Sequence, residues 1–138
     1  MEKQNTKTIL VDAVYSLVSD KGVIFQEMFD LLEEYPNRKI ILTNADDEKW
    51  EQYGLNKMPY EVFTLKHNPE KTNPEYYEKL LSHFGLKADD VIYFEHNAGA
   101  VKSAESVGIK SYFYDQDKKD LVDLKNFIDE NVVYGKEK

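Results

Sequence analysis

The sequence predicts an α/β fold in which a mainly parallel sheet lies between two layers of helices. Short apolar runs without alternation recur along the chain, as expected for strands that are covered on both faces. Amphipathic segments with helical spacing separate these runs. Several runs end on polar residues, and ligands of such sheets gather at the carboxyl ends of the strands. We therefore expect a three-layer α/β/α sandwich of Rossmann-like type, with its functional site at that edge.

The composition fits one globular domain and disfavours several classes of function. The chain has 138 residues, 41% hydrophobic and 13% aromatic, which is enough to bury a core. A formal net charge of −8, with acids and bases mixed along the chain, disfavours nucleic acid and anionic membranes as partners. The lack of cysteine excludes disulfides, thiolate zinc sites and cysteine nucleophiles. The polar start of the chain and the lack of a membrane-length apolar run predict a cytoplasmic protein without a signal peptide.

Five segments are predicted to be strands of this sheet. Each is short and apolar, and polar or turn-forming residues bound it. The first strand ends abruptly on Asp12, the second on Thr43, and the fourth on the sequence Glu95-His96-Asn97. The expected strands cover residues 8–12, 39–43, 61–65, 91–94 and 109–114.

The segments between the strands are predicted to be helical, apart from a small flap after the first strand. A turn signal at residues 20–22, between β-prone pieces, predicts this flap. Thr72 is expected to cap a helix that carries Pro74 in its first turn and ends at Gly85, and Asp117 is expected to cap the last helix. The helices are indicated by apolar stripes at Phe25, Met28, Phe29 and Leu32, at Trp50, at Tyr77, Leu80, Leu81 and Phe84, at Val101, Ala104 and Val107, and at Leu121, Leu124 and Ile128.

The order of the polar residues at the strand ends resembles the haloacid dehalogenase (HAD) superfamily. Asp12 follows the first strand, Thr43 the second, Lys71 precedes a helix that begins with proline, and Glu95-His96 follows the fourth strand. Residues 71–77 resemble the Lys-Pro-x-Pro-x-x-aromatic segment of that superfamily, and residues 104–109 resemble its Ala-x-x-x-Gly-Ile segment. The resemblance covers residues 7–130 and implies one HAD-like domain, residues 1–138, without a cap domain.

The resemblance implies hydrolysis of a phosphoester through a covalent intermediate. It assigns the role of nucleophile to Asp12, because a carboxylate can attack phosphorus in line at neutral pH. It assigns a hydrogen bond to a phosphoryl oxygen to Thr43, and stabilisation of the nucleophile and phosphate charge to Lys71. Lys66 is close enough in the sequence to be an alternative to Lys71. The candidate substrate-binding residues are Asn44 and Asn97.

Two positions depart from the pattern of the superfamily's phosphatases. Val14 stands where a second aspartate serves as general acid and base, and a valine side chain transfers no proton. Glu95-His96 stands where the second residue of the pair is usually the aspartate that holds Mg²⁺. The resemblance therefore implies an Mg²⁺ site built from Asp12, the Val14 carbonyl, Glu95 and His96, although imidazole is a poor ligand for this cation.

Three alternatives to an active phosphatase stay open from the sequence. One is an inactive protein of the same fold that binds a phosphorylated ligand or a protein partner. A haloacid dehalogenase would need no Mg²⁺, and Asp12-Ala13, Ser16 and Leu17 match its first motif, but the chain lacks its helical cap. A flavodoxin-like or receiver-type signalling domain would share the strand-end aspartate and a lysine, but it would need an acidic pair near the first strand, and Glu2 lies too far upstream to supply one.

A site without a cap is open to solvent. It suits a phosphorylated small molecule or macromolecule, or a protein partner that covers the opening. Six aromatic side chains are candidates for such a surface, although packing is the favoured interpretation: Tyr15, Trp50, Tyr53, Tyr60, Tyr76 and Tyr77. His67 and His83 have no companions at the spacing of metal ligands and are interpreted as structural.

Overall fold

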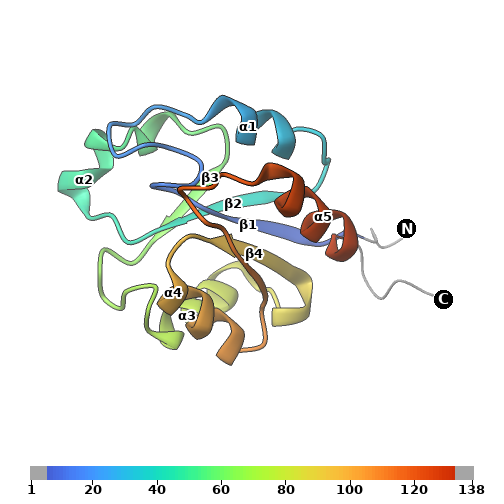
Figure 1. The fold of residues 1–138 in the computed structure, drawn as a ribbon. Coiled ribbons are helices and arrows are strands. Elements are labelled where there is room, and N and C mark those ends of the chain that lie inside the picture. The colour runs from blue at the N-terminus through green and yellow to red at the C-terminus, as the bar shows by residue number, and fades with distance from the viewer. Residues whose placement is uncertain (1–5, 133–138) are drawn as a thin grey trace.

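Five parallel strands form the central sheet of residues 6–132, the part of the chain that the computed structural model describes (Figure 1). The order across the sheet is β3-β2-β1-β4-β5, so β1 lies in the middle and pairs with both β2 and β4. This confirms the predicted parallel sheet. The strands are β1 (Thr8–Asp12), β2 (Lys39–Thr43), β3 (Glu61–Thr64), β4 (Val91–Glu95) and β5 (Lys110–Phe113).

Helices cover both faces of the sheet and give the predicted three layers. The helices are α1 (Gln26–Leu32), α2 (Asp47–Gln52), α3 (Pro74–Phe84), α4 (Ala98–Ser106) and α5 (Leu121–Asn131), with short 3-10 turns at Leu55–Lys57 and Ala88–Asp90. Figure 1 shows α1 and α5 on one face of the sheet and α3 and α4 on the other. Among residues 6–132, no helix is long and apolar enough to cross a membrane.

Apolar and polar residues do not alternate in the strands because helices cover both faces of the sheet. Ile9 and Val11 of β1 pack in the apolar cluster that includes α1 and α5, whereas Leu10 between them packs in the cluster that includes α3 and α4. All three side chains are fully buried. Each such burial stabilises the fold by about 1.5–3 kcal/mol, so β1 is fixed from both faces. Tyr76 and Tyr77 are also fully buried, as the packing interpretation predicted.

A flap follows β1 where the sequence predicted one. Isolated bridges join Val18 to Val14 and to Ile24, and the turn at its tip contains Gly22. Gly22 has a φ of +81°, and a Cβ there would lie 3.0 Å from the backbone carbonyl carbon of Tyr53. Only glycine fits this approach without strain. In the described residues, this flap and α1 make up the connection from β1 to β2, and no cap domain is inserted.

Two predicted helix N-caps are wrong: the cap of α3 lies one residue later than predicted, and the cap of α5 three residues later. Asn73, not Thr72, caps α3, because the Asn73 side chain accepts a hydrogen bond from the Glu75 N–H at 2.9 Å. Asp120, not Asp117, caps α5, and its side chain accepts from the Asp123 N–H at 3.0 Å. The predicted end of α3 is confirmed at Gly85, which has a φ of +66°.

Candidate active site

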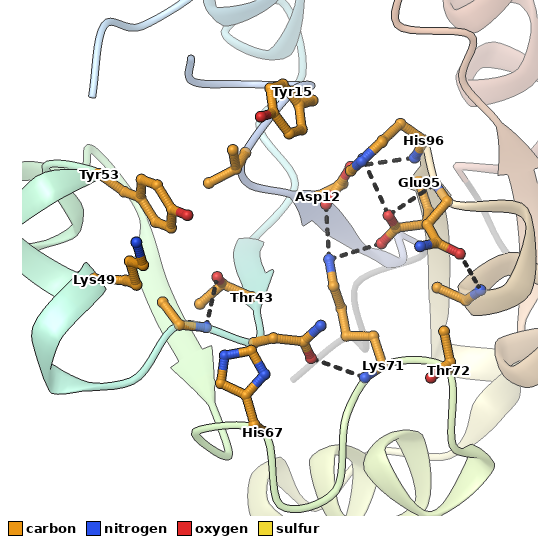
Figure 2. Close-up of a pocket in the computed structure, with 15 residues that line it drawn as sticks. Asp12, Tyr15, Thr43, Lys49, Tyr53, His67, Lys71, Thr72, Glu95 and His96 are labelled. Atoms are coloured by element: carbon orange, nitrogen blue, oxygen red, sulfur yellow. Dashed lines mark hydrogen bonds and ion pairs between the residues drawn. The ribbon is translucent and has the colours of Figure 1, made fainter. Parts of the chain in front are cut away.

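The predicted site residues lie around one pocket at the carboxyl edge of the sheet. The chain builds β2 and β3 on one side of β1, and then returns to build β4 and β5 on the other side. Ligands of open α/β sheets bind in the crevice at such a reversal, here between β1 and β4. The pocket has a volume of about 310 Å³ (Figure 2). The predicted residues that line it are Asp12, Val14, Thr43, Asn44, Lys71, Glu95, His96 and Asn97.

Lys71 connects the carboxylates that end β1 and β4. Its Nζ atom lies 2.7 Å from Oδ1 of Asp12 and 2.8 Å from Oε1 of Glu95 (Figure 2). Burial by itself would lower the pKa of Lys71, but the two carboxylates outweigh it and raise that pKa above its ordinary value. The ammonium group is therefore charged. Lys66 instead forms a surface ion pair with Asp47, so Lys71, not Lys66, is the lysine that contacts Asp12.

The second oxygen of Asp12 accepts three hydrogen bonds. Its Oδ2 accepts from the Ser16 hydroxyl at 2.6 Å, from the His96 backbone N–H at 3.2 Å and from the His96 ring Nδ1 at 2.5 Å. Burial by itself would raise the pKa of Asp12, but the charge of Lys71 and the contact with His96 outweigh it and lower that pKa. Asp12 is consequently an ionised carboxylate, although its side chain is only 1% exposed.

Glu95 is held on both of its oxygens. Oε1 accepts from Lys71 and from the Tyr93 hydroxyl, and Oε2 accepts from the Asn97 backbone N–H at 3.1 Å. Burial, and next to it the charge of Glu95, raises the pKa of Tyr93. The phenol therefore stays protonated and donates a hydrogen bond to Glu95. Oε2 also lies 3.3 Å from the His96 ring Nδ1. These contacts fix the carboxylate of Glu95 beside that of Asp12.

His96 carries the second positive charge of the site. Burial by itself would lower its pKa, but the hydrogen bonds to Asp12 and Glu95 raise it to about 9. The ring of Tyr15 packs edge-on against it, with 5.5 Å between ring centres. At neutral pH the two carboxylates are therefore matched by two cations, Lys71 and His96.

The implied Mg²⁺ site does not fit these residues. Ligand atoms of Asp12, Glu95 and His96 lie within 4.8 Å of one another, and such a cluster is a candidate for a metal ion. Mg²⁺ prefers oxygen ligands in octahedral geometry. The four carboxylate oxygens present here already accept hydrogen bonds, and a protonated imidazole stands between the two groups. Val14, the remaining predicted ligand, is half-buried and lines the pocket.

Thr43, Asn44 and Asn97 each use an oxygen to shape the site. The Thr43 hydroxyl accepts from the Ala45 N–H at 3.1 Å, and the Asn44 side-chain carbonyl accepts from the Lys71 N–H at 2.8 Å. The Asn97 side chain caps α4 by accepting from the Ala100 N–H at 3.1 Å. The hydroxyl proton of Thr43 and the two amide NH₂ groups are the parts that would donate to a ligand.

Seven further residues line the pocket. Tyr15 and Tyr53 were among the aromatic candidates for its surface, whereas the sequence did not indicate Ala45, Lys49, His67, Thr72 and Ala100 as site residues. Lys49 and Tyr53 are four residues apart at the end of α2, a spacing that places side chains on one helix face. His67, interpreted from the sequence as structural, lies in the loop after β3 with its Nδ1 2.9 Å from Glu70. No local pattern marked this loop as part of the pocket.

The fold and the strand-end residues define an α/β protein with a HAD-like fold. A parallel sheet of this order carries a buried carboxylate at the end of β1, a hydroxyl at the end of β2, a lysine before α3 and an acid at the end of β4. This arrangement agrees with the resemblance seen in the sequence.

Solved structures of HAD-superfamily proteins share this fold. The HAD family enzyme bt-2542 from Bacteroides thetaiotaomicron superposes with a TM-score of 0.69 at 13% identity, over 88% of this chain and 98% of that chain. A predicted HAD-like family hydrolase from Porphyromonas gingivalis gives 0.68 at 12% identity, over 91% and 98% of the two chains. A HAD-superfamily hydrolase from Ehrlichia chaffeensis gives 0.62 at 12% identity, over 94% and 98%. No protein-family model and no curated protein matches the chain.

Proposed function

We propose that this chain is a HAD-type hydrolase that transfers the phosphoryl group of a phosphoester to Asp12. The observation that carries the proposal is the buried, ionised Asp12 on the floor of the pocket, fixed by Lys71 on one oxygen and by Ser16 and His96 on the other. The structurally similar proteins include HAD-family hydrolases, and a crystal of the Bacteroides enzyme contains magnesium and inorganic phosphate. We further propose that it is cytoplasmic and does not bind nucleic acid, the latter because the chain carries a formal net charge of −8.

The proposed reaction has two steps. In the first, an Asp12 carboxylate oxygen attacks phosphorus, the bond from phosphorus to the leaving oxygen breaks, and an aspartyl phosphate forms. Lys71 and the donors of Thr43 and Asn44 would stabilise the charge on the phosphoryl oxygens. In the second step, water attacks the phosphorus, the bond to Asp12 breaks, and inorganic phosphate leaves.

The lack of an acid at Val14 limits the substrates that we expect. An alkoxide leaving group needs a proton from a general acid, and such assistance contributes about 10²–10⁴-fold to the rate. Val14 lines the pocket and provides no proton. We therefore propose that the enzyme acts on phosphoesters whose leaving group is acidic, such as an aryl phosphate, in preference to alkyl phosphates.

A second candidate is an inactive protein that binds a phosphorylated ligand or a protein partner at the same pocket. Val14 favours it, because neither the leaving group nor the attacking water has a proton carrier at that position. The open pocket also has an exposed aromatic rim residue, Tyr15, which is 48% exposed. Such a surface suits contact with a partner.

Hydrolysis of an aryl phosphate distinguishes the two candidates. Purified wild-type protein and the Asp12→Asn variant would be assayed in Mg²⁺ and in EDTA, with circular dichroism to confirm that the variant is folded. The hydrolase proposal predicts release of phosphate by the wild type and none by the variant. Equal activity in both proteins would contradict the assignment of Asp12, and no activity in either would favour the binding protein.

A further inference from the structure

The ring of His96 lies in the space between the two acidic side chains of the pocket. Its Nδ1 is 2.5 Å from Oδ2 of Asp12 and 3.3 Å from Oε2 of Glu95 (Figure 2). The backbone N–H of His96 donates to the same Asp12 oxygen, so both ends of this residue are anchored there. An ionised carboxylate only accepts hydrogen bonds, so Nδ1 must carry the proton.

The protonated ring in this position disfavours a divalent cation between the two carboxylates. Mg²⁺ would lie about 2.0–2.1 Å from each oxygen ligand. Nδ1 lies 2.5 Å from Asp12 Oδ2 and 3.3 Å from Glu95 Oε2, but a protonated ring nitrogen has no lone pair for a metal, so a cation that bridged these two oxygens would face an N–H group. Binding would require the His96 ring to lose this proton or to move away, and both carboxylate oxygens would then lose a donor.

The other two carboxylate oxygens, Oδ1 of Asp12 and Oε1 of Glu95, also accept hydrogen bonds. Lys71 donates to Oδ1 of Asp12 and to Oε1 of Glu95, and Tyr93 donates to that same Glu95 oxygen. All of these side chains are buried, so a metal would have to displace hydrogen bonds between buried groups.

We propose that His96 takes the place of the divalent metal in this site, so that the pocket binds a phosphate group without a metal ion. This inference rests on the proposed function for its ligand class, a phosphate or phosphate monoester. The structurally similar Bacteroides enzyme, in contrast, has been crystallised with magnesium. Asp12 and Glu95 then act as fixed acceptors that hold Lys71 and His96 toward the ligand, rather than as metal ligands.

Calorimetric titration with MgCl₂ and with inorganic phosphate tests this inference. The proteins would be the wild type, His96→Asp, which replaces the ring with a carboxylate, and His83→Gln as a matched control. His83 is an exposed histidine of α3 that packs against Phe63 and Phe84. We expect His96→Asp to bind Mg²⁺ at least roughly tenfold more tightly than the wild type, and His83→Gln to behave like the wild type.

The phosphate titration tests the wild-type protein alone, by comparing its affinity for phosphate with and without Mg²⁺. Wild-type affinity for phosphate should be the same in EDTA and in Mg²⁺, within about threefold. A requirement for Mg²⁺ in the wild type would overturn the inference, and so would Mg²⁺ binding by the wild type as tight as that of folded His96→Asp. Lack of phosphate binding under every condition would contradict the proposed function, and the Mg²⁺ titration would then still decide the role of His96.

Discussion

The Nζ atom of Lys71 lies 2.7 Å from Oδ1 of Asp12, although the two residues are 59 positions apart in the chain. Both side chains are buried, at 8% and 1% exposure. The contact joins the loop before α3 to the end of β1, and Glu95 of β4 shares the same lysine. A buried ion pair of this kind contributes little net stability compared with apolar packing. The loss of one partner, however, leaves the other charge buried without compensation.

Lys71→Met should therefore destabilise the protein strongly. The substitution keeps much of the side-chain volume, but it leaves Asp12 and Glu95 without their shared cation. We expect a loss of about 3–5 kcal/mol in the free energy of unfolding, measured by urea denaturation. The control Lys66→Met removes an exposed pair with Asp47 and should cost less than about 1 kcal/mol. Similar losses in the two variants would contradict the buried charge network.

Stability should decrease as the pH rises through the pKa of His96. The unfolded value is 6.5 and the folded value is about 9, so the imidazolium stabilises the fold fully below pH 6.5 and progressively less as the pH rises to 9. Because the ring is 19% exposed and water screens part of the interaction, we expect a loss of about 1–2 kcal/mol. Urea unfolding at several pH values measures it.

The variant His96→Gln provides the comparison for this pH dependence. Glutamine donates a hydrogen bond but does not titrate, so its unfolding free energy should vary much less than that of the wild type between pH 6.5 and 9. An equal decrease in both proteins would show that another group causes it.

Asn97 should contribute to stability through the start of α4. Its side chain accepts from the Ala100 N–H, and loss of such a cap costs about 1 kcal/mol. Asn97→Ala should lower the free energy of unfolding by this amount, whereas Asn97→Asp, which keeps an acceptor at the cap, should retain it. Thermal unfolding of the three proteins measures the difference. Equal losses in the two variants would show that the amide has a different structural role.

The rate of hydrolysis should depend steeply on the leaving group. Because Val14 provides no proton, the enzyme should prefer aryl phosphates with electron-withdrawing substituents over alkyl phosphates. Val14→Asp would place an acid at that position, and we expect it to reduce the preference. Steady-state kinetics on a series of aryl and alkyl phosphates measure this dependence. A flat series for the wild type would indicate that another residue protonates the leaving group.

The sheet was predictable from the sequence because its signal is local and strong. Continuous apolar runs such as 8–12 and 39–43 occur where both faces of a strand are covered, and both strands are completely buried. The helix caps were less predictable, because Ser, Thr, Asn and Asp serve at this position almost equally well. The cap is Asn73 rather than Thr72, and the backbone carbonyl of Thr72 accepts a hydrogen bond from the Ser103 hydroxyl of α4. A contact of that kind depends on the tertiary fold.

The site was predictable as a set of strand-end residues but not as a network. Parallel strands bring their carboxyl ends to one edge, and this alone placed Asp12, Thr43 and Glu95 together. The resemblance implied an Mg²⁺ site built from Asp12, Val14, Glu95 and His96, and the structure places the His96 ring between the carboxylates of Asp12 and Glu95. The direction of a side chain cannot be predicted from a sequence pattern. The path of the loop that brings His67 to the pocket could not be predicted either.

Detection of a phosphorylated Asp12 tests the proposed chemistry most directly. The wild type and Asp12→Asn would be mixed with an aryl phosphate in EDTA, quenched in acid and analysed by peptide mass spectrometry. The proposal predicts that the wild-type peptide containing Asp12 gains the mass of one phosphoryl group, and that the variant peptide does not. Release of phosphate by the wild type without any phosphorylated Asp12, at times that span the first turnover, would contradict it.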